Sequence, residues 1–449
     1  MSISLEEKDL KHIWHPCSQM KDYEKLPPIV IDHAKGMYLY DIHGKKYMDI
    51  ISSWWCNLFG HCNERINTAL KNQVDNLEHV IFANFSHKPA IELCELLCEV
   101  LPKGLNKFLF TDNGSSAIEA AIKLSFQYHY QVGQVHRKTF MSLSDAYHGE
   151  TVGALSVSGM DLYAEIFKPL LFDIVRVDAP DCYRCKYGKC RESCNAECFE
   201  SAEKAFEQYG NVTSGFIIEP IVQGAAGMRM YSPVYLKKLR KICDKYNVHL
   251  IDDEIAMGYG RTGKMFGCDH ADISPDIMCV SKGLTGGYLP MALCISTDEI
   301  YNAFYDDYNK RKAFMHSHTY SGNALACSVA VEILKILKEE KIIENSQDKR
   351  QYFKDLVYNT FKDYKYAGDI RSQGLINAIE LVEDKNTKKP FDSKKRIGYQ
   401  VYKKALEKGL LLRPIGDILY FNPPLTIEPD EMQFAVKTCL QSIKEVLGE

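Results

Sequence analysis

Short apolar runs alternate with segments of helical spacing through the middle of the chain. The run at 107–110 precedes a segment in which apolar or small residues recur three or four positions apart, from Ile118 to Ser125. Such short runs predict buried strands, and that spacing predicts a helix. Strands that alternate with helices predict a parallel sheet covered by helices on both faces. The other strand-like runs are 140–143, 216–218, 249–255 and 277–280.

One predicted helix has both of its ends marked in the sequence. Ser232 and Pro233 are typical of an N-cap and a first helical position, and apolar residues continue on one face from Leu236 to Cys243. The pattern stops near Asn247, which predicts the C-terminal end there.

The two ends of the chain have a different pattern. Around the turn 41–46, short strand-like runs predict a hairpin, and the C-terminal part mixes helices with short strands at 374–380 and 418–421. We therefore predict an α/β protein with a large domain of mainly parallel sheet between helices, and a smaller α+β domain built from both termini. The predicted large domain spans residues 76–335, and the smaller one combines 1–75 with 336–449.

Composition excludes several classes of protein. The chain has 449 residues, of which 46% are hydrophobic and 25% are charged, as in ordinary globular proteins. The net charge of −4 gives no electrostatic argument for binding nucleic acid or an anionic membrane. The first residues lack the apolar core of a signal peptide, and no run approaches the ~20 apolar residues of a spanning helix. We expect a soluble, cytoplasmic protein that acts on small molecules.

The sixteen cysteines are numerous for such a chain, and five of them lie in one polar segment. One Cys-x-x-Cys pair and three further cysteines do not match a standard zinc pattern, but they are able to ligate zinc or an iron–sulfur cluster. The alternative is a surface excursion whose thiols stay reduced and peripheral to the chemistry, and we expect no metal in the active site. The five cysteines are Cys182, Cys185, Cys190, Cys194 and Cys198.

Two polar residues stand at the ends of predicted buried strands. Lys282 follows the run 277–280, and Asp253 lies at the end of the run 249–255. A buried lysine is costly unless its amine has a task. In parallel sheets, ligands bind beyond the carboxyl ends of the strands, so Lys282 and Asp253 are able to converge. An amine and a carboxylate placed in this way are what pyridoxal phosphate needs, although Lys282 taken alone is better explained as a surface lysine after a strand.

Further polar positions extend this candidate site. Gly114 and Ser115 lie between a strand and a helix start, where backbone amides form an anion site. Ser116 and Glu119 also have the spacing of a capping box, which is an alternative that does not exclude the first. Tyr147 follows a strand and is able to stack on a planar ring or simply to pack.

Two arginines are candidates for recognising a substrate carboxylate through their fork geometry. These are Arg261 and Arg413, and each is as readily explained by a structural ion pair. The glycines of the segment 258–263 lack the spacing of a dinucleotide-binding loop, so we reject that interpretation.

Taken together, the motifs carry a family resemblance. Residues 253–263, followed by 282–287, resemble the signature of class III pyridoxal-phosphate aminotransferases, which have the type I fold of such enzymes. The segments 13–16, 52–55 and 219–231, with others, are similar to the members that aminate 8-amino-7-oxononanoate in biotin synthesis. The resemblance runs from about residue 11 to about residue 440.

The resemblance implies a role for each matching residue and a homodimer with shared sites. Lys282 matches the lysine that forms the Schiff base, and Asp253 matches the acid on the pyridine nitrogen. Gly114 and Ser115 match the residues that bind the cofactor phosphate, and Tyr147 matches the aromatic residue over the ring and beside the substrate. Thr319 matches a threonine that reaches the phosphate bound by the partner subunit. Trp54 and Arg413 match positions of the substrate pocket, where Arg413 binds the substrate carboxylate.

The amino donor is left open by three departures from the family pattern. Cys17 stands where members that use S-adenosylmethionine often have tyrosine, His318 where they have proline, and Glu150 where aspartate is usual. We expect S-adenosylmethionine as donor, with lysine as the alternative. The competing hypotheses are another class III ω-aminotransferase, a metal or redox protein centred on 182–198, and a cofactor-binding protein without catalysis.

Overall fold

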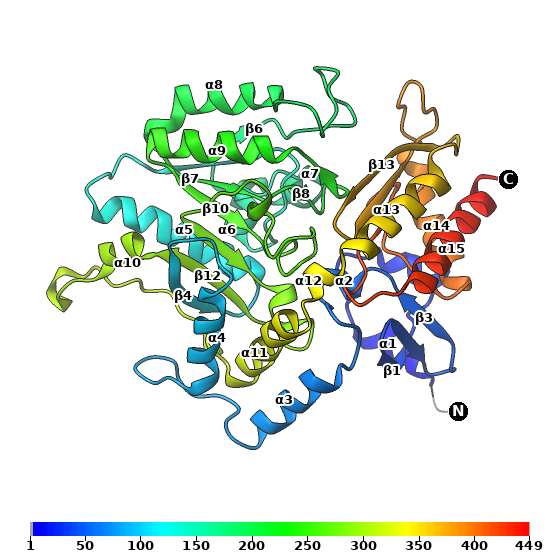
Figure 1. The fold of residues 1–449 in the computed structure, drawn as a ribbon, viewed down its shortest axis with the longest axis horizontal. Coiled ribbons are helices and arrows are strands. Elements are labelled where there is room, and N and C mark those ends of the chain that lie inside the picture. Colours follow the sequence, from blue (N-terminus) through cyan, green and yellow to red (C-terminus); the bar gives the residue numbers. More distant parts are fainter. Residues whose placement is uncertain (1–2, 449) are drawn as a thin grey trace.

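The computed structural model describes residues 3–448, so Met1, Ser2 and Glu449 of the predicted terminal segments lie outside the described residues. Its centre is a seven-stranded sheet with the order β4-β12-β11-β10-β7-β5-β6 (Figure 1). Strand β12 runs antiparallel to both of its neighbours, and the other pairs are parallel. The prediction of a mainly parallel α/β sheet is therefore confirmed.

The elements have the following bounds. The strands are β1 (Ile31–Lys35), β2 (Tyr38–Asp41), β3 (Lys46–Asp49), β4 (Leu105–Thr111), β5 (Thr139–Leu143), β6 (Val175–Val177), β7 (Thr213–Ile218), β8 (Val222–Gln223), β9 (Arg229–Met230), β10 (His249–Asp253), β11 (Ile277–Val280), β12 (Ala292–Thr297), β13 (Ala367–Gln373), β14 (Ile376–Leu381), β15 (Leu410–Leu411) and β16 (Ile418–Phe421). The α-helices are α1 (Leu5–His12), α2 (Ser52–Trp55), α3 (Glu64–Val74), α4 (Lys88–Cys98), α5 (Gly114–Gln131), α6 (Val152–Val157), α7 (Asp161–Ala164), α8 (Glu200–Tyr209), α9 (Pro233–Tyr246), α10 (Asp298–Phe304), α11 (Ala324–Glu339), α12 (Ile342–Asn345), α13 (Gln347–Phe361), α14 (Ile397–Glu407) and α15 (Pro429–Leu447).

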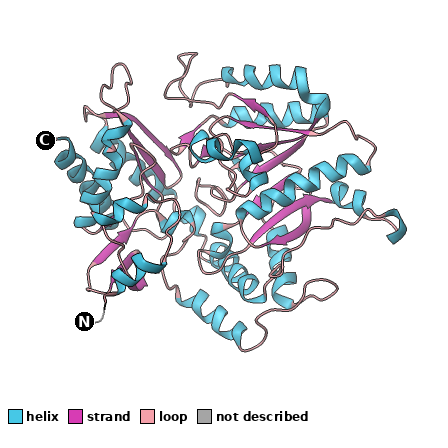
Figure 2. Cartoon of the chain, turned by 180° about the vertical axis from the view of Figure 1, so that it is seen from behind, coloured by secondary structure: helices cyan, strands magenta, loops and turns pink. Residues whose placement is uncertain are grey.

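Both faces of the central sheet are buried, because successive side chains of each strand point to opposite sides. Ile251 of β10 packs in a cluster with the apolar side of α5, whereas Leu250 belongs to the larger core that also contains Leu236 and Leu239 of α9. Asp253 consequently lies on the α5 side of β10, and Asp252 on the other. Figure 2 shows from behind how helices enclose the strands.

The helix ends follow their sequence signals with one exception. Helix α9 begins after the N-cap Ser232 and ends at Asn247, which adopts a left-handed conformation, as predicted. The predicted capping box of Ser116 and Glu119 is wrong. Asn113 caps α5 by accepting a hydrogen bond from the Ser116 backbone N–H, and the Glu119 carboxylate instead accepts one from Gly153. Asn113 precedes glycine and two serines, so two cap positions competed in the sequence.

The two ends of the chain share a sheet. Strands β1, β2 and β3 form the predicted antiparallel hairpin structure, and β15 from the C-terminal part pairs in parallel with β3. A separate antiparallel sheet contains β13, β14 and β16. The exact domain boundaries stay a prediction. Among the described residues, no helix is long and apolar enough to cross a membrane.

The short element α2 is a left-handed turn and not a right-handed helix, and it lies beside the pocket described below. Ser52, Ser53, Trp54 and Trp55 all have positive φ angles, between 45° and 72°. Non-glycine residues adopt this conformation at a cost, so the surrounding structure must hold them. The buried guanidinium of Arg261 does so, because it donates hydrogen bonds to the Ser52 hydroxyl and to the carbonyls of Trp55 and other residues.

Candidate active site

A pocket of about 490 Å³ opens at the carboxyl ends of the parallel strands. The segments after β4, β5, β7, β10 and β11 line it together with Trp55 and Cys56, and it includes Gly114, Tyr147, Asp253 and Lys282. Asp253 and Lys282 therefore lie in the same pocket, as predicted.

One end of the pocket is the N-terminus of α5. The first four N–H groups of a helix have no partner within it, and here Asn113 takes that of Ser116. The amides of Gly114 and Ser115 are left at the pocket wall. A side chain at Gly114 would come within 2.9 Å of Ile255, and one at Gly149 within 2.2 Å of the Ser115 hydroxyl. Small residues thus keep the space above this helix end open for an anion.

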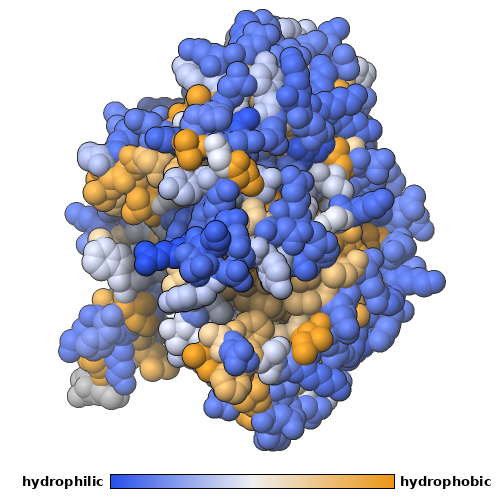
Figure 3. All heavy atoms as spheres, turned by 90° about the vertical axis from the view of Figure 1, so that its left-hand side faces the viewer, coloured by the Kyte–Doolittle hydropathy of each residue, from blue (hydrophilic) through white to orange (hydrophobic). Residues whose placement is uncertain are grey.

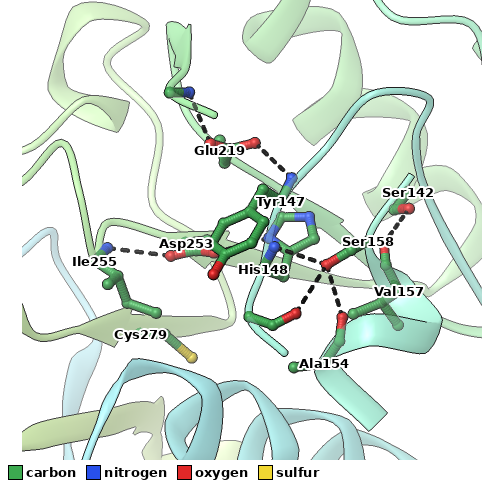
Figure 4. A network of polar contacts seen from close by, with 12 residues as sticks. Ser142, Tyr147, His148, Ala154, Val157, Ser158, Glu219, Asp253, Ile255 and Cys279 are labelled. Atoms are coloured by element: carbon green, nitrogen blue, oxygen red, sulfur yellow. Dashed lines mark hydrogen bonds and ion pairs between the residues drawn. The ribbon is translucent and has the colours of Figure 1, made fainter. Parts of the chain in front are cut away.

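Asp253 lies on the pocket floor and is held from two sides (Figure 4). One carboxylate oxygen is 2.7 Å from Nδ1 of His148, and the other accepts a hydrogen bond of 3.1 Å from the Ile255 backbone. His148 is fully buried, and its Nε2 has no partner among the described residues. His148 was not among the predicted site residues, although it lies next to the predicted Tyr147 in the sequence.

Lys282 is the second residue after β11 and lines the pocket. Its Nζ lies 4.8 Å from the ring centre of Trp55, and its backbone has a positive φ of 43°. Burial lowers the pKa of the Lys282 amine, and the negative charge of Asp253 opposes this only in part. A larger fraction of the amine is therefore neutral and nucleophilic than in water.

Glu219 was not assigned a role from the sequence. It accepts hydrogen bonds from the backbone N–H groups of Tyr147, at 3.0 Å, and Gly224, at 2.9 Å (Figure 4). Burial raises the pKa of Glu219 to about 7, while nearby His148 lowers it. Its carboxyl group connects the Tyr147 loop to the turn after β7.

Tyr147 begins a chain of polar contacts that leads out of the pocket. Its hydroxyl donates to Glu150 at 2.9 Å, and the thiol of Cys17 lies 3.7 Å from the same oxygen. Arg413 donates to the Cys17 carbonyl at 2.8 Å, and its guanidinium lies 5.5 Å from the ring centre of Trp54. This chain of contacts brings the Glu150 carboxylate and the Arg413 guanidinium close to Cys17. Of the five residues only Tyr147 lines the pocket, so the structure does not place the predicted Trp54 and Arg413 in its wall.

Two candidates lie apart from this arrangement. Thr319 is exposed and does not line the pocket of its own chain, although the neighbouring His318 contacts the Asp112 backbone. Arg261 is buried and uses its terminal amino groups on Ser52 and backbone carbonyls. Of the two arginines considered for a carboxylate, Arg413 alone is linked to Tyr147 of the pocket, through Cys17 and Glu150.

The cysteine-rich segment lies away from the pocket. Its irregular backbone is tied to the C-terminal sheet by Arg184, whose guanidinium is 2.6 Å from Glu380, and by Arg191, which donates to the Ser372 carbonyl. All five of its cysteines are free thiols. In residues 3–448, the only close group of potential metal ligands is elsewhere, so no three of these thiols lie within 4.8 Å of one another.

Comparison with known proteins decides the family. A model described as "Aminotransferase class-III" matches residues 19–447. The chain belongs to the class III aminotransferases. It is 40% identical to the adenosylmethionine-8-amino-7-oxononanoate aminotransferase of Geobacter sulfurreducens over 99% of this chain and 98% of that one.

Solved structures agree with this assignment. The Methanocaldococcus jannaschii protein of the same name superposes with a TM-score of 0.93 at 40% identity, covering 98% of each chain. An omega transaminase from Pseudomonas jessenii in complex with PMP superposes with a TM-score of 0.93 at 32% identity, covering 99% of this chain and 98% of that one. The predicted type I fold is confirmed.

The cofactor of a class III aminotransferase is pyridoxal phosphate, and the pocket fits it. The free amides at α5 suit its phosphate, the buried carboxylate of Asp253 suits a protonated ring nitrogen, and the poorly solvated amine of Lys282 suits its carbonyl carbon.

Proposed function

We propose that this aminotransferase converts 8-amino-7-oxononanoate to 7,8-diaminononanoate in biotin synthesis. The observation that carries the proposal is the name shared by relatives that are 40–41% identical over 98–99% of this chain. The omega transaminases superpose equally well but are only 31–32% identical, which makes their activity the second candidate.

In this proposal, Lys282 binds the cofactor and later moves a proton. Pyridoxal phosphate supplies a carrier for the amino group and an electron sink. The Lys282 amine would hold the cofactor through its carbonyl carbon until a donor amine is bound. Nζ of Lys282 then removes the proton from the carbon that bears the donor amine. Its lowered pKa favours this role, because an amine must be unprotonated to accept a proton.

Asp253 and His148 hold the ring end of the cofactor. We assign to the Asp253 carboxylate the task of keeping the pyridine nitrogen protonated through its negative charge. The 2.7 Å contact with His148 and the Ile255 amide fix the direction of that carboxylate. Gly114 and Ser115 bind the phosphate, and the ring of Tyr147 covers the cofactor face.

Arg413 and Trp54 form the acceptor site. The guanidinium of Arg413 has donors left after its bond to the Cys17 carbonyl, and it offers a fork to the substrate carboxylate. Trp54 is 44% exposed and presents an apolar face beside this charge, which suits a long aliphatic acid.

We further propose a homodimer that completes each site with Thr319 of the partner subunit. The exposed position of Thr319 agrees with such a role. Several large apolar side chains are also exposed in the single chain, including Leu162, Ile166 and Met315, each at least 84% exposed. Exposed apolar groups of this size are typical of subunit interfaces. Figure 3 shows apolar patches and a hollow on one face. A cytoplasmic location stays a prediction.

The amino donor is the open part of the proposal. We favour S-adenosylmethionine because the relatives carry it in their name. Lysine stays the second candidate, because the thiol of Cys17 is a poorer hydrogen-bond partner than the phenol usual there. The contacts of Cys17 and Tyr147 with Glu150 place a carboxylate next to the Tyr147 hydroxyl, and this carboxylate suits an ammonium group of either donor.

Two assays test the proposal. Purified enzyme should aminate 8-amino-7-oxononanoate, and should do so far faster than it aminates simple ketones; a preference for simple ketones would favour the ω-aminotransferase. Mixing the enzyme with each donor alone should change the visible absorbance of the bound cofactor with S-adenosylmethionine. A rapid change with lysine and none with S-adenosylmethionine would reverse the choice of donor.

A further inference from the structure

Two buried acids lie behind the strand that carries Asp253. Asp252 and Glu254 flank Asp253 in the sequence and therefore point to the opposite face of β10, away from the pocket. Asp252 is 2% exposed and Glu254 is fully buried. One oxygen of each, together with the sulfur of Cys268, lies within 4.8 Å of the others.

These acids have more oxygens than donors to satisfy them. One oxygen of Glu254 accepts a hydrogen bond of 2.9 Å from the Cys268 backbone. The other oxygen of Glu254 and both oxygens of Asp252 lack an N–H or O–H donor among residues 3–448, and the Cys268 thiol near Asp252 is only a weak donor. A buried carboxylate without a donor costs free energy, and two ionised carboxylates in contact cost more.

The surroundings supply no counter-charge. The ionisable groups that act on the pair are Asp253 on the same strand, Cys268 and Asp269 on the following loop, Tyr231 and Tyr259 from the packed segments, and Cys279 on β11. These carboxyl, thiol and phenol groups are neutral or negatively charged at every pH, so none of them balances the charge of the pair. The cation of that loop, Lys264, donates to the Asp269 carbonyl.

We propose that Asp252 and Glu254 share one proton on the back of β10, and that this shared proton positions Asp253. A proton between the two carboxyl groups gives an O–H···O hydrogen bond and leaves one negative charge instead of two. Without it, the acids on both sides of Asp253 would repel each other, and the strand end would have to shift. Asp253 would then leave its alignment with His148.

A metal ion is the alternative occupant of this cluster. Structural zinc takes four protein ligands, whereas the cluster offers three ligand atoms. A proton requires neither the fourth ligand nor additional space, so it is the simpler solution.

The shared proton has a consequence for stability that is independent of catalysis. Burial raises the pKa of Glu254 from 4.5 to about 8, and that of Asp252 well above its ordinary value. Between pH 4.5 and about 8, the folded protein keeps a proton on this pair of carboxyl groups that the unfolded chain releases. Stability therefore falls as pH rises from about 4.5 towards 8, by up to about tenfold in the unfolding equilibrium constant per pH unit.

The test compares Asp252→Asn with the wild-type holoenzyme by denaturant unfolding at pH 6, 7 and 8. The amide that replaces the Asp252 carboxylate donates a hydrogen bond to Glu254 at every pH, so no shared proton is needed. The slope of the unfolding free energy against pH should therefore be smaller in the variant, by the equivalent of about one proton. Asp272→Asn, which removes an exposed acid from the same loop, should leave the wild-type slope unchanged. Equal slopes for wild type and Asp252→Asn would overturn the shared proton. So would a stoichiometric metal that Asp252→Asn loses.

The positioning role has its own measurement. In the wild type, kcat and the visible absorbance of the cofactor should fall at alkaline pH, where the shared proton is lost. In Asp252→Asn this fall should occur at a higher pH, and KM should be unchanged. A uniform loss at every pH would show that the residues are merely structural. Glu254→Gln should give the same two results, and it replaces Asp252→Asn if that variant does not fold. The unfolding slopes do not depend on substrate identity, so failure of the proposed function is distinguishable from failure of this inference.

Discussion

At the scale of single residues, the site depends on charges that burial has adjusted. The Lys282 amine has a lowered pKa because it lies in a poorly solvated pocket, and the nearby charge of Asp253 opposes that effect. Lys282 also has a left-handed backbone, which the structure tolerates at some cost. Such strain at a residue with an adjusted pKa is typical of a catalytic position.

Replacing Lys282 with alanine should abolish transamination. The variant loses the amine that binds the cofactor and moves the proton, whereas the amides at α5 remain for the phosphate. Turnover assays should show no activity above background, and the visible absorbance of the cofactor attached to the enzyme should disappear. Wild-type turnover in Lys282→Ala would exclude the assigned role.

Asp253→Asn should fold but react slowly. The change removes the charge that favours a protonated ring nitrogen, at a cost on the order of 2–4 kcal/mol, or ~30- to 1000-fold in kcat. The matched variant His148→Asn keeps the Asp253 charge and removes part of its support, so its loss should be smaller. Steady-state kinetics on both variants show which of them loses more kcat. Near-normal turnover of Asp253→Asn would contradict the role assigned to the Asp253 charge.

At the scale of elements, the strands and their ends were predictable because the signals are local. Alternation of apolar runs and helical spacing predicted the central strands, and Ser232 with Asn247 predicted both ends of α9. Asp253 and Lys282 followed from their positions at strand ends. The left-handed turn at 52–55 was not predictable, because Arg261 holds it from about 200 positions away. The contact of His148 with Asp253 likewise joins residues 105 positions apart.

The turn gives a test of that long-range support. Arg261→Met should lower the free energy of unfolding by about 3–5 kcal/mol, because buried carbonyls at Trp55, Asn57 and Pro423 lose their donors. Denaturant unfolding measures this change. Lys264→Met, in the same segment but exposed, should change it by less than about 0.5 kcal/mol. Similar values for the two variants would mean that Arg261 does not hold the turn.

The cysteine-rich segment should matter for stability and not for chemistry. Replacing its five cysteines with serine should leave amination of the keto acid largely intact. The partly buried thiols of Cys182 and Cys198 pack against the core, so the free energy of unfolding should fall by about 1–3 kcal/mol. Activity assays, unfolding curves and metal analysis check this. Zinc or iron lost together with activity would contradict the prediction.

At the scale of the whole molecule, a single chain leaves the proposed site incomplete. The pocket contains the residues for the ring and for covalent attachment, whereas Thr319 is exposed outside it. The segment around Thr319 nevertheless lies close to the α5 end of the pocket, because His318 accepts a hydrogen bond from the Asp112 backbone. A two-fold axis near this region would bring Thr319 of each subunit to the phosphate site of the other.

Mixed dimers test this arrangement directly. In a dimer of one Lys282→Ala and one Thr319→Ala subunit, the site with the intact Lys282 receives the intact Thr319 of its partner, and activity should return. Random exchange makes half of the dimers mixed with one good site each, so an equal mixture should reach about a quarter of wild-type activity. If Thr319 instead served its own chain, the site with Lys282 would still lack it, and mixing would restore nothing. Lys282→Ala mixed with the double variant is the inactive control. A fully active monomer in light scattering would exclude the shared site altogether.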